Sequence, residues 1–135
     1  MIDTTAAPQA ARQPTLERLK KRADFLRAAK GVRRVMTGLT LELCPMPEVG
    51  NGGIRVGFTA SRKIGGAVER NRARRRLRAA AQTVLPLCGL PGNDYVLVAR
   101  RETLSRPFED LISDLKSALA AAHARLGRSQ PGDVR

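Results

Sequence analysis

The sequence predicts an α+β fold, a sandwich in which helices pack on one mixed sheet. Apolar residues alternate with polar or small ones in residues 39–43 and 54–58, run without interruption in residues 95–99, and recur at helical spacing in three longer segments. These segments follow one another as helix, two or three strands, helix, strand and helix, an order typical of helices packed on a sheet. The chain has 135 residues, of which 42% are hydrophobic, so we expect one domain with one core.

The ordered domain is expected to span residues 15–127. Residues 1–14 are small, polar and interrupted by proline, and residues 128–135 are similar, so we interpret them as a flexible N-terminal arm and a flexible C-terminal tail. No segment approaches the roughly 20 apolar residues of a membrane-spanning helix. No charged-then-apolar signal segment opens the chain, and we therefore expect a cytoplasmic protein with no membrane partner.

The first helix is predicted over Thr15–Ala29, with Thr15 as its N-cap and Gly31 as its stop. Its core face would consist of Leu16, Leu19, Ala23 and Leu26. A neighbouring stripe carries an aromatic ring and two guanidinium groups, and consists of Arg18, Arg22, Phe25 and Ala29. Phe25 fits two interpretations at this point, a side chain at the edge of the core or an exposed stacking platform.

The next two strands are predicted to form a hairpin. Leu39, Leu41 and Leu43 alternate with polar residues, and the Pro/Gly/Asn-rich residues 45–53 connect this strand to Ile54–Ala60. The second strand has an apolar face of Ile54, Val56 and Phe58 and a small polar face of Arg55, Gly57 and Thr59. We expect a ligand backbone to approach the small face closely. A short extra strand near Arg34–Met36 stays open.

The strongest signal is a basic helix predicted over about Gly66–Leu85 and ended by Pro86. Its inward stripe is Ala73, Leu77, Ala80 or Ala81, and Val84, and the opposite stripe is Asn71, Arg75, Arg78 and Gln82. Residues 62–78 hold eight basic residues and one acidic residue, so this segment carries +7 of the net charge of +13.

A buried strand over Asp94–Arg100 and a helix over about Arg106–Leu126 complete the domain. Ser105 is the candidate N-cap of this helix, Pro107 suits its first turn, and Gly127 suits its stop. Its core stripe is predicted as Phe108, Leu111, Leu115, Leu119, Ala122 and Leu126. His123 is expected at a surface position of this helix.

The net charge of +13 favours a polyanionic partner, and nucleic acid is preferred to an acidic membrane because the chain lacks Trp and its Phe residues are scattered. A charge run is often only a solvated face. Here seven of the eight basic residues are Arg, which pairs bidentately with phosphate, and their mutual repulsion would be relieved by an external anion. The Gly65–Gly66 pair would let a phosphate come close. Folded RNA is favoured over duplex DNA because the helix offers guanidinium groups rather than varied base-reading side chains.

The sequence offers no catalytic residues of its own. A lone His123 cannot supply both the acid and the base of a metal-independent nuclease. Cys44 and Cys88 have no CxxC spacing, so buried thiols are favoured over a disulfide, and a zinc site is disfavoured because four ligands are not at hand.

The stretch Ile54–Arg78, IRVGFTASRKIGGAVERNRARRRLR, resembles the signature of the protein component of bacterial ribonuclease P. The family's Arg-Asn-Arg core falls on Arg70–Arg72, and its serine and two basic residues fall on Ser61–Lys63. Arg18–Lys21 with Asp24 and Phe25 resembles the family's first helix, and residues 94–100 resemble its last strand. The resemblance covers about residues 16–126.

This resemblance implies a left-handed βαβ crossover, against the usual preference, and a small RNA-binding protein. Its partners would be the catalytic RNA of ribonuclease P and precursor tRNA, and the protein by itself would be a monomer without activity. The holoenzyme would be an endoribonuclease that removes the 5′ leader of precursor tRNA, with Mg²⁺ held by RNA and substrate phosphates and with no organic cofactor.

By position, the resemblance implies two sets of contact residues and no catalytic or metal-binding residue. The catalytic RNA would be bound by Arg62, Lys63, Arg70, Asn71, Arg72, Arg74, Arg75 and Arg78. The leader would be bound by Phe25, Arg18, Arg22 and Arg55. Ala29 stands where many relatives have a second aromatic residue. A basic ribosomal protein, a self-sufficient nuclease and a DNA-binding regulator are the alternatives.

Overall fold

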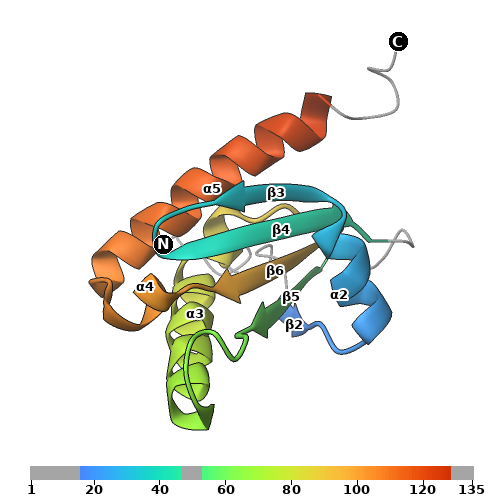
Figure 1. Ribbon diagram of the computed structural model, residues 1–135. Helices are drawn as coiled ribbons and strands as arrows, with labels where there is room; N and C mark the ends of the chain where they lie inside the picture. The colour runs from blue at the N-terminus through green and yellow to red at the C-terminus, as the bar shows by residue number, and fades with distance from the viewer. Residues whose placement is uncertain (1–15, 47–52, 129–135) are drawn as a thin grey trace, which may run out of the picture.

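The computed structural model describes residues 16–46 and 53–128, and the α+β prediction is confirmed in them (Figure 1). The elements follow in the order β2 (Leu16–Arg18), α2 (Arg22–Ala29), β3 (Val32–Val35), β4 (Leu39–Pro45), β5 (Ile54–Thr59), α3 (Ala67–Cys88), β6 (Asn93–Ala99), α4 (Arg101–Ser105) and α5 (Phe108–Arg128). The strands form one mixed sheet in the order β2-β5-β6-β4-β3. Within the described residues, no helix is long and apolar enough to cross a membrane.

The sheet lies between two unequal layers of helices. On one face, α3 and α5 cover the main core, which includes Leu41 of β4, Leu77 of α3 and Leu115 of α5. On the other face, α2 covers a small cluster of Leu19, Ala28, Cys44 and Val96. The alternation of side chains along β4 and β6 sends successive residues to the two layers. This arrangement leaves part of the sheet face beside α2 without a helix above it.

The predicted hairpin between residues 39–43 and 54–60 is wrong. β4 pairs antiparallel with β3 and with β6, whereas β5 pairs parallel with β2 and with β6. β6 is apolar on both faces and therefore takes the centre of the sheet, where it separates β4 from β5. The hairpin partner of β4 is instead the short extra strand left open above, here β3. Residues 47–52 of the predicted turn lie outside the described residues.

The predicted first helix is too long at its N-terminal end. Residues Leu16–Arg18 form an edge strand that pairs in register with Ile54–Val56, and Leu19 N–H continues the pairing to Val56 O at 2.9 Å. Leu26 was expected in the core, but its side chain is 51% exposed, and Ala23 is exposed as well. The predicted cap Thr15 and both predicted terminal arms lie outside the described residues, except for Arg128.

The basic helix α3 agrees with its predicted inward stripe, because Ala73, Leu77, Ala80, Ala81 and Val84 are all buried. It continues through Pro86 to Cys88, so the proline lies in its last turn rather than at its end. α3 connects the parallel neighbours β5 and β6 as a βαβ crossover. The left-handed sense of this crossover stays a prediction.

The last predicted helix is two helices. α4 ends at Ser105, and Pro107 precedes the start of α5, so Ser105 does not cap the long helix. Arg106 at the joint is fixed by Asp114 of α5, whose Oδ2 accepts from Arg106 Nε at 2.6 Å. Phe108, predicted in the core, is 39% exposed beside this joint. The helix also runs past its predicted stop, Gly127.

His123 is half-buried rather than on the surface, because it packs against the central strand. Its Nε2 lies 2.8 Å from Tyr95 Oη, and Tyr95 Oη accepts a hydrogen bond from Leu90 N–H at 2.8 Å. Burial lowers the pKa of His123 and raises the pKa of Tyr95 to about 12. The hydroxyl proton of Tyr95 is therefore available to an unprotonated Nε2.

Candidate nucleic-acid interface

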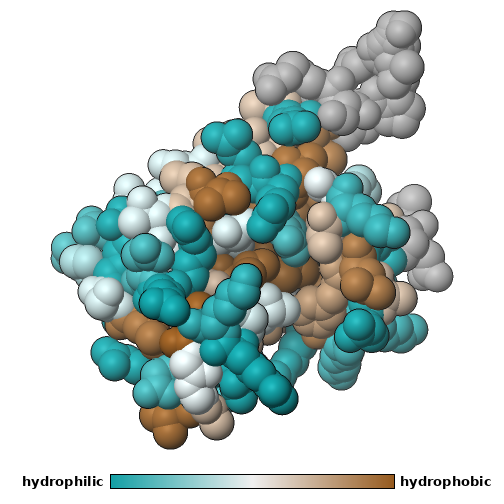
Figure 2. All heavy atoms as spheres, in the orientation of Figure 1, coloured by the Kyte–Doolittle hydropathy of each residue, from teal (hydrophilic) through white to brown (hydrophobic). Residues whose placement is uncertain are grey.

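The outer side of α3 presents the predicted basic stripe to solvent. Arg62, Lys63, Asn71, Arg72 and Arg75 are exposed, and Arg70, Arg74 and Arg78 are half-buried. Hydrophilic side chains cover much of the lower part of the molecule, where α3 descends from the sheet (Figures 1 and 2). The structure therefore brings this predicted set together on one helix and the turn before it.

The arginines of α3 have no carboxylate partners in the described residues. Ion pairs are formed instead by arginines outside α3, among them Arg27, Arg33, Arg55 and Arg106. Arg70 donates to Gly65 O at 3.3 Å, and Arg74 donates to Asn71 Oδ1 at 2.9 Å. These neutral acceptors leave the positive charge uncompensated, so the stripe is ready to bind an external anion.

Arg76, which was not predicted to contact RNA, points to the other side of α3. Its Nη2 donates to the carbonyl oxygen of Arg106, at the joint between α4 and α5. This arginine therefore ties the basic helix to the rest of the domain.

The glycine pair before α3 shapes the start of the helix. Gly65 has a φ of +146°, and a Cβ there would lie 2.9 Å from the Cβ of Glu69. The Glu69 carboxylate accepts from Gly66 N–H at 3.0 Å. The N-terminus expected to hold a phosphate is thus already capped by the one acidic residue of the segment.

Phe25 lies on the other face of the sheet, directly over Gly57. A Cβ on Gly57 would come within 2.5 Å of the Phe25 ring, so glycine is required for the ring to lie this close to β5. The space expected to admit a ligand backbone is therefore filled by Phe25. The ring is half-buried against the small cluster under α2, so part of its surface stays open to solvent.

Arg55 is bound to two carboxylates, one from α2 and one from β6. Asp94, with a fully buried side chain, accepts from Arg55 Nε and Nη2 at 2.7 Å each and from Arg27 Nη2 at 2.7 Å. Asp24 of α2 pairs with Arg27 at 2.8 Å and with Arg55 at 3.4 Å. The hydrogen bond to Asp94 raises the pKa of Arg55 despite its partial burial. This network fixes α2 to β5 and β6.

The predicted stripe of Arg18, Arg22 and Phe25 is split by the structure. Arg22 and Phe25 lie on α2, whereas Arg18 belongs to β2 and lines a pocket with Phe58 and Arg78 on the α3 side. Helical spacing places these three residues on one face only if residues 15–29 form one continuous helix, which they do not.

Sequence reasoning missed a basic hollow of about 450 Å³ on the sheet face that α2 leaves uncovered. Its floor includes Thr40 and Val98, and its basic rim consists of Arg33, Lys63, Arg100 and Arg101. Arg33 pairs with Glu42 at 3.7 Å, and Arg100 donates to Met36 O at 2.6 Å, so Lys63 and Arg101 are the rim side chains without a partner among the described residues. The signal that could have found it is the pair of arginines that directly follows the central strand.

The family model described as Ribonuclease P matches residues 14–123 of the chain. The chain belongs to the ribonuclease P protein family. One relative, the ribonuclease P protein component of Ruegeria pomeroyi, is 53% identical over 108 residues, which are 78% of this chain and 86% of the relative. That of Paramagnetospirillum magneticum is 50% identical over 107 residues, or 77% of this chain and 80% of the relative.

Solved structures of ribonuclease P proteins have the same fold. The Staphylococcus aureus protein is 26% identical, with a TM-score of 0.64 over 78% of this chain and 94% of that chain. The Thermotoga maritima protein is 24% identical, with a TM-score of 0.65 over 78% of this chain and 96% of that chain. The predicted family, α+β fold and role as a protein component of an endoribonuclease that processes tRNA 5′ ends are thus confirmed.

Proposed function

We propose that this ribonuclease P protein uses its two faces for two different RNAs. The stripe on α3 would bind the catalytic RNA, and the opposite sheet face, from Phe25 to the basic hollow, would bind the single-stranded leader of precursor tRNA. The observation that carries the proposal is the set of α3 guanidinium groups that no carboxylate of the described chain neutralises. Phosphates of a folded RNA supply the missing negative charge.

The leader surface combines stacking with charge. The exposed surface of the Phe25 ring would offer a base-stacking platform, with Arg22 on the preceding turn of α2. The rim of Arg33, Lys63 and Arg101 would follow the leader's phosphates across the hollow. Arg55 acts here as a positioning residue, because both of its hydrogen bonds go to Asp94. Lys63 stands where the two surfaces meet.

The chemical step is assigned to RNA. The carboxylates Asp24, Asp94 and Asp114 are already paired with guanidinium groups, so they do not fit a Mg²⁺ site. We therefore place the metal ions on phosphates of the RNA and the substrate. With precursor tRNA as its substrate, the protein would act in the cytoplasm.

The α3 assignment is tested by reconstitution with the catalytic RNA at low Mg²⁺, with removal of the 5′ leader as the readout. Arg75→Gln should lower the affinity for the RNA by about 1–2 kcal/mol, because a charge-assisted contact to phosphate is lost. Lys116→Gln removes the same charge at an exposed position of α5, outside the predicted stripe, and is the matched control. Equal losses for the two variants would contradict the proposal. Leader removal by the protein without RNA would revive a self-sufficient nuclease.

The leader assignment is tested with the assembled enzyme. Phe25→Ala should weaken binding of precursor tRNA by about 1–3 kcal/mol, the value of one base stack, and leave the affinity for leaderless tRNA unchanged. Dissociation constants of both RNAs are measured for wild type, Phe25→Ala and Leu26→Ala, whose exposed apolar side chain is the next along α2. An unchanged preference of Phe25→Ala for the precursor would reject the platform.

A further inference from the structure

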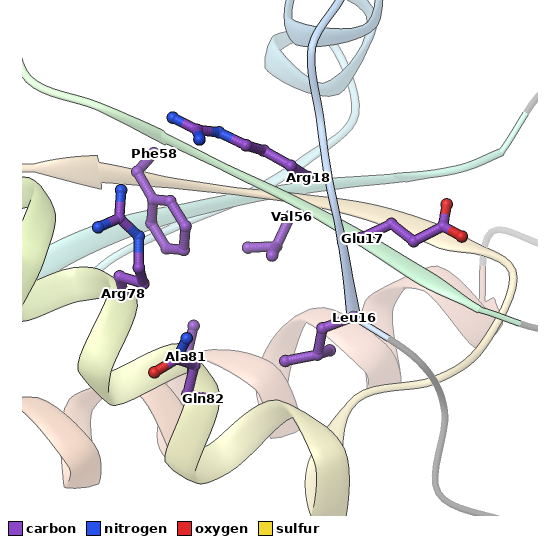
Figure 3. A pocket seen from close by; sticks show the side chains of 8 residues that line it. All are labelled: Leu16, Glu17, Arg18, Val56, Phe58, Arg78, Ala81 and Gln82. Carbon is purple, nitrogen blue, oxygen red and sulfur yellow. The ribbon is translucent and has the colours of Figure 1, made fainter.

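A second pocket, of about 140 Å³, lies between the edge of the sheet and the C-terminal half of α3. Phe58 and Val56 reach into it from β5, Leu16 reaches in from β2, and Ala81 closes it from α3 (Figure 3). It opens on the α3 side of the sheet and is separated from Phe25 by β5 itself. This pocket is therefore separate from the surface that we propose binds the leader.

The pocket has an aromatic wall with a cation beside it. The Arg78 guanidinium carbon lies 5.7 Å from the centroid of the half-buried Phe58 ring. Such a ring and guanidinium pair provides a flat, polarisable surface for another planar group. The cavity is far larger than one water molecule requires, which is about 10–15 Å³.

The rim of the pocket supplies hydrogen-bonding groups that the described chain does not use. Arg18, Arg78 and Gln82 line it, and none of their side chains hydrogen-bonds to another described residue. Gln82 offers both a donor and an acceptor, as the edge of a nucleobase does. Glu17 also lines the pocket, but its carboxylate points away from Phe58 (Figure 3).

We infer that this pocket captures one unstacked nucleobase of the catalytic RNA, stacked against Phe58 and bonded at its edge by Gln82. The inference rests on the proposed RNA-binding role of α3, because Arg78 belongs both to the basic stripe and to the pocket. A base in the pocket places its own phosphates beside Arg18 and Arg78, so the charge of the rim matches a nucleotide. The position of the pocket, on the α3 side, assigns the base to the catalytic RNA rather than to the leader.

The first test separates base capture from phosphate binding by its dependence on salt. Gln82→Ala should weaken the affinity for the catalytic RNA roughly three- to tenfold, and Phe58→Leu roughly tenfold. Both variants should keep the wild-type slope of log K against log salt, because neither removes a phosphate contact, whereas Arg75→Gln should make the slope shallower. Thr83→Ala is the matched control, since Thr83 is exposed on the same turn, outside the pocket.

Each result decides between distinct conclusions. Gln82 is exposed, so its substitution leaves the core intact and the test does not depend on Phe58→Leu folding. If wild type and Thr83→Ala bind the RNA while Gln82→Ala binds equally well, base capture is overturned and the α3 assignment stands. If wild type itself does not bind, the proposed function fails.

The second test identifies the base. The photoreactive residue benzoylphenylalanine at position 82 of the full chain, in the reconstituted holoenzyme, should crosslink to one unpaired nucleotide of the catalytic RNA. Crosslinking to the precursor leader, or to many RNA positions equally, would overturn the inference. The same probe at position 83 serves as the control.

Discussion

At the residue scale, the absence of a side chain on Gly57 determines where Phe25 lies. The ring occupies the volume that any Cβ on Gly57 would need. The sequence indicated that Phe25 and Gly57 were special, one as an aromatic beside arginines and the other as a small residue in a strand. It could not indicate that one explains the other, because they meet across the chain through tertiary packing.

Gly57→Ala should displace the Phe25 ring and destabilise the fold by about 1–3 kcal/mol, the usual cost of overpacking. Urea unfolding measures this, with Thr59→Ser on the same face of β5 as the control. Precursor affinity should fall together with stability, since the stacking platform moves. A variant of wild-type stability would mean that the ring is not held against the strand.

Asp94→Asn should be more costly than its conservative chemistry indicates. The carboxylate is fully buried and accepts from two arginines, so the amide would leave two partly buried guanidinium groups with Asp24 as their one remaining counter-charge in the network. The expected loss is about 2–4 kcal/mol, reduced from the value for a wholly buried pair because Arg27 is partly exposed. Urea unfolding of Asp94→Asn is compared with Asp110→Asn, an exposed position on α5. Equal stabilities would show that the pairing contributes little.

At the element scale, length and periodicity separate the correct predictions from the wrong ones. α3 repeats its apolar spacing over 22 residues, so chance agreement is small and its buried stripe was predicted residue by residue. β2 has three residues, too few to show alternation, and Leu16 together with Leu19 just after the strand happened to continue the spacing of α2. Arg18 was therefore assigned to the wrong face of the domain. The break between α4 and α5 was missed because Pro107 also suits a first turn.

The contact between α5 and β6 should make stability depend on pH. Burial lowers the pKa of His123 in the folded state, while the unfolded chain keeps a value near 6.5. Below about pH 6.5 the unfolded chain binds a proton that the folded protein disfavours, so the free energy of unfolding falls as the pH drops through this range. Above about pH 6.5, His123 is neutral in both the folded and the unfolded state, and its full contribution to the free energy of unfolding is present.

His123→Gln keeps a hydrogen-bonding group near Tyr95 but removes the imidazole that titrates in this pH range. Wild type should lose stability relative to this variant between pH 7 and pH 5, measured by urea unfolding at each pH. A difference that stays constant over this range would mean that His123 titrates alike in both states.

At the scale of the whole molecule, which has a net charge of +13, the positive charges are unevenly compensated by carboxylates. Arginines near α2 and at the α4–α5 joint are neutralised within the chain, whereas those of α3 are not. Binding of the catalytic RNA should therefore weaken steeply with salt, by roughly 0.7–0.9 log units per log unit of salt for each phosphate contact. Each arginine of the outer stripe of α3 that is replaced should reduce the slope by about that amount, whereas replacing Arg76 or Arg106 should not. Filter binding over a salt series checks this, and a slope that α3 variants leave unchanged would contradict it.

The overall architecture was predictable, and the pairing of its strands was not. Apolar periodicity identified the layers, and the run of arginines indicated the side of the molecule that we propose binds RNA. Strand order depends on which strand fills the centre, and the local turn composition of residues 45–53 gave no information about the competing partner β6. The basic hollow was missed for the same reason, since its rim comes from β3, the turn before α3 and the start of α4.

The central position of β6 has a consequence for synthesis of the protein. Without β6, the sheet consists of two separate pairs, β2 with β5 and β3 with β4. A ribosome must therefore translate past residue 99 before the sheet can close, by which time the arginine-rich helix has already been made. The nascent chain therefore exposes the basic helix to polyanions while the sheet still consists of two separate strand pairs. An RNA that binds at this stage would contact a helix that is not yet packed on a complete sheet.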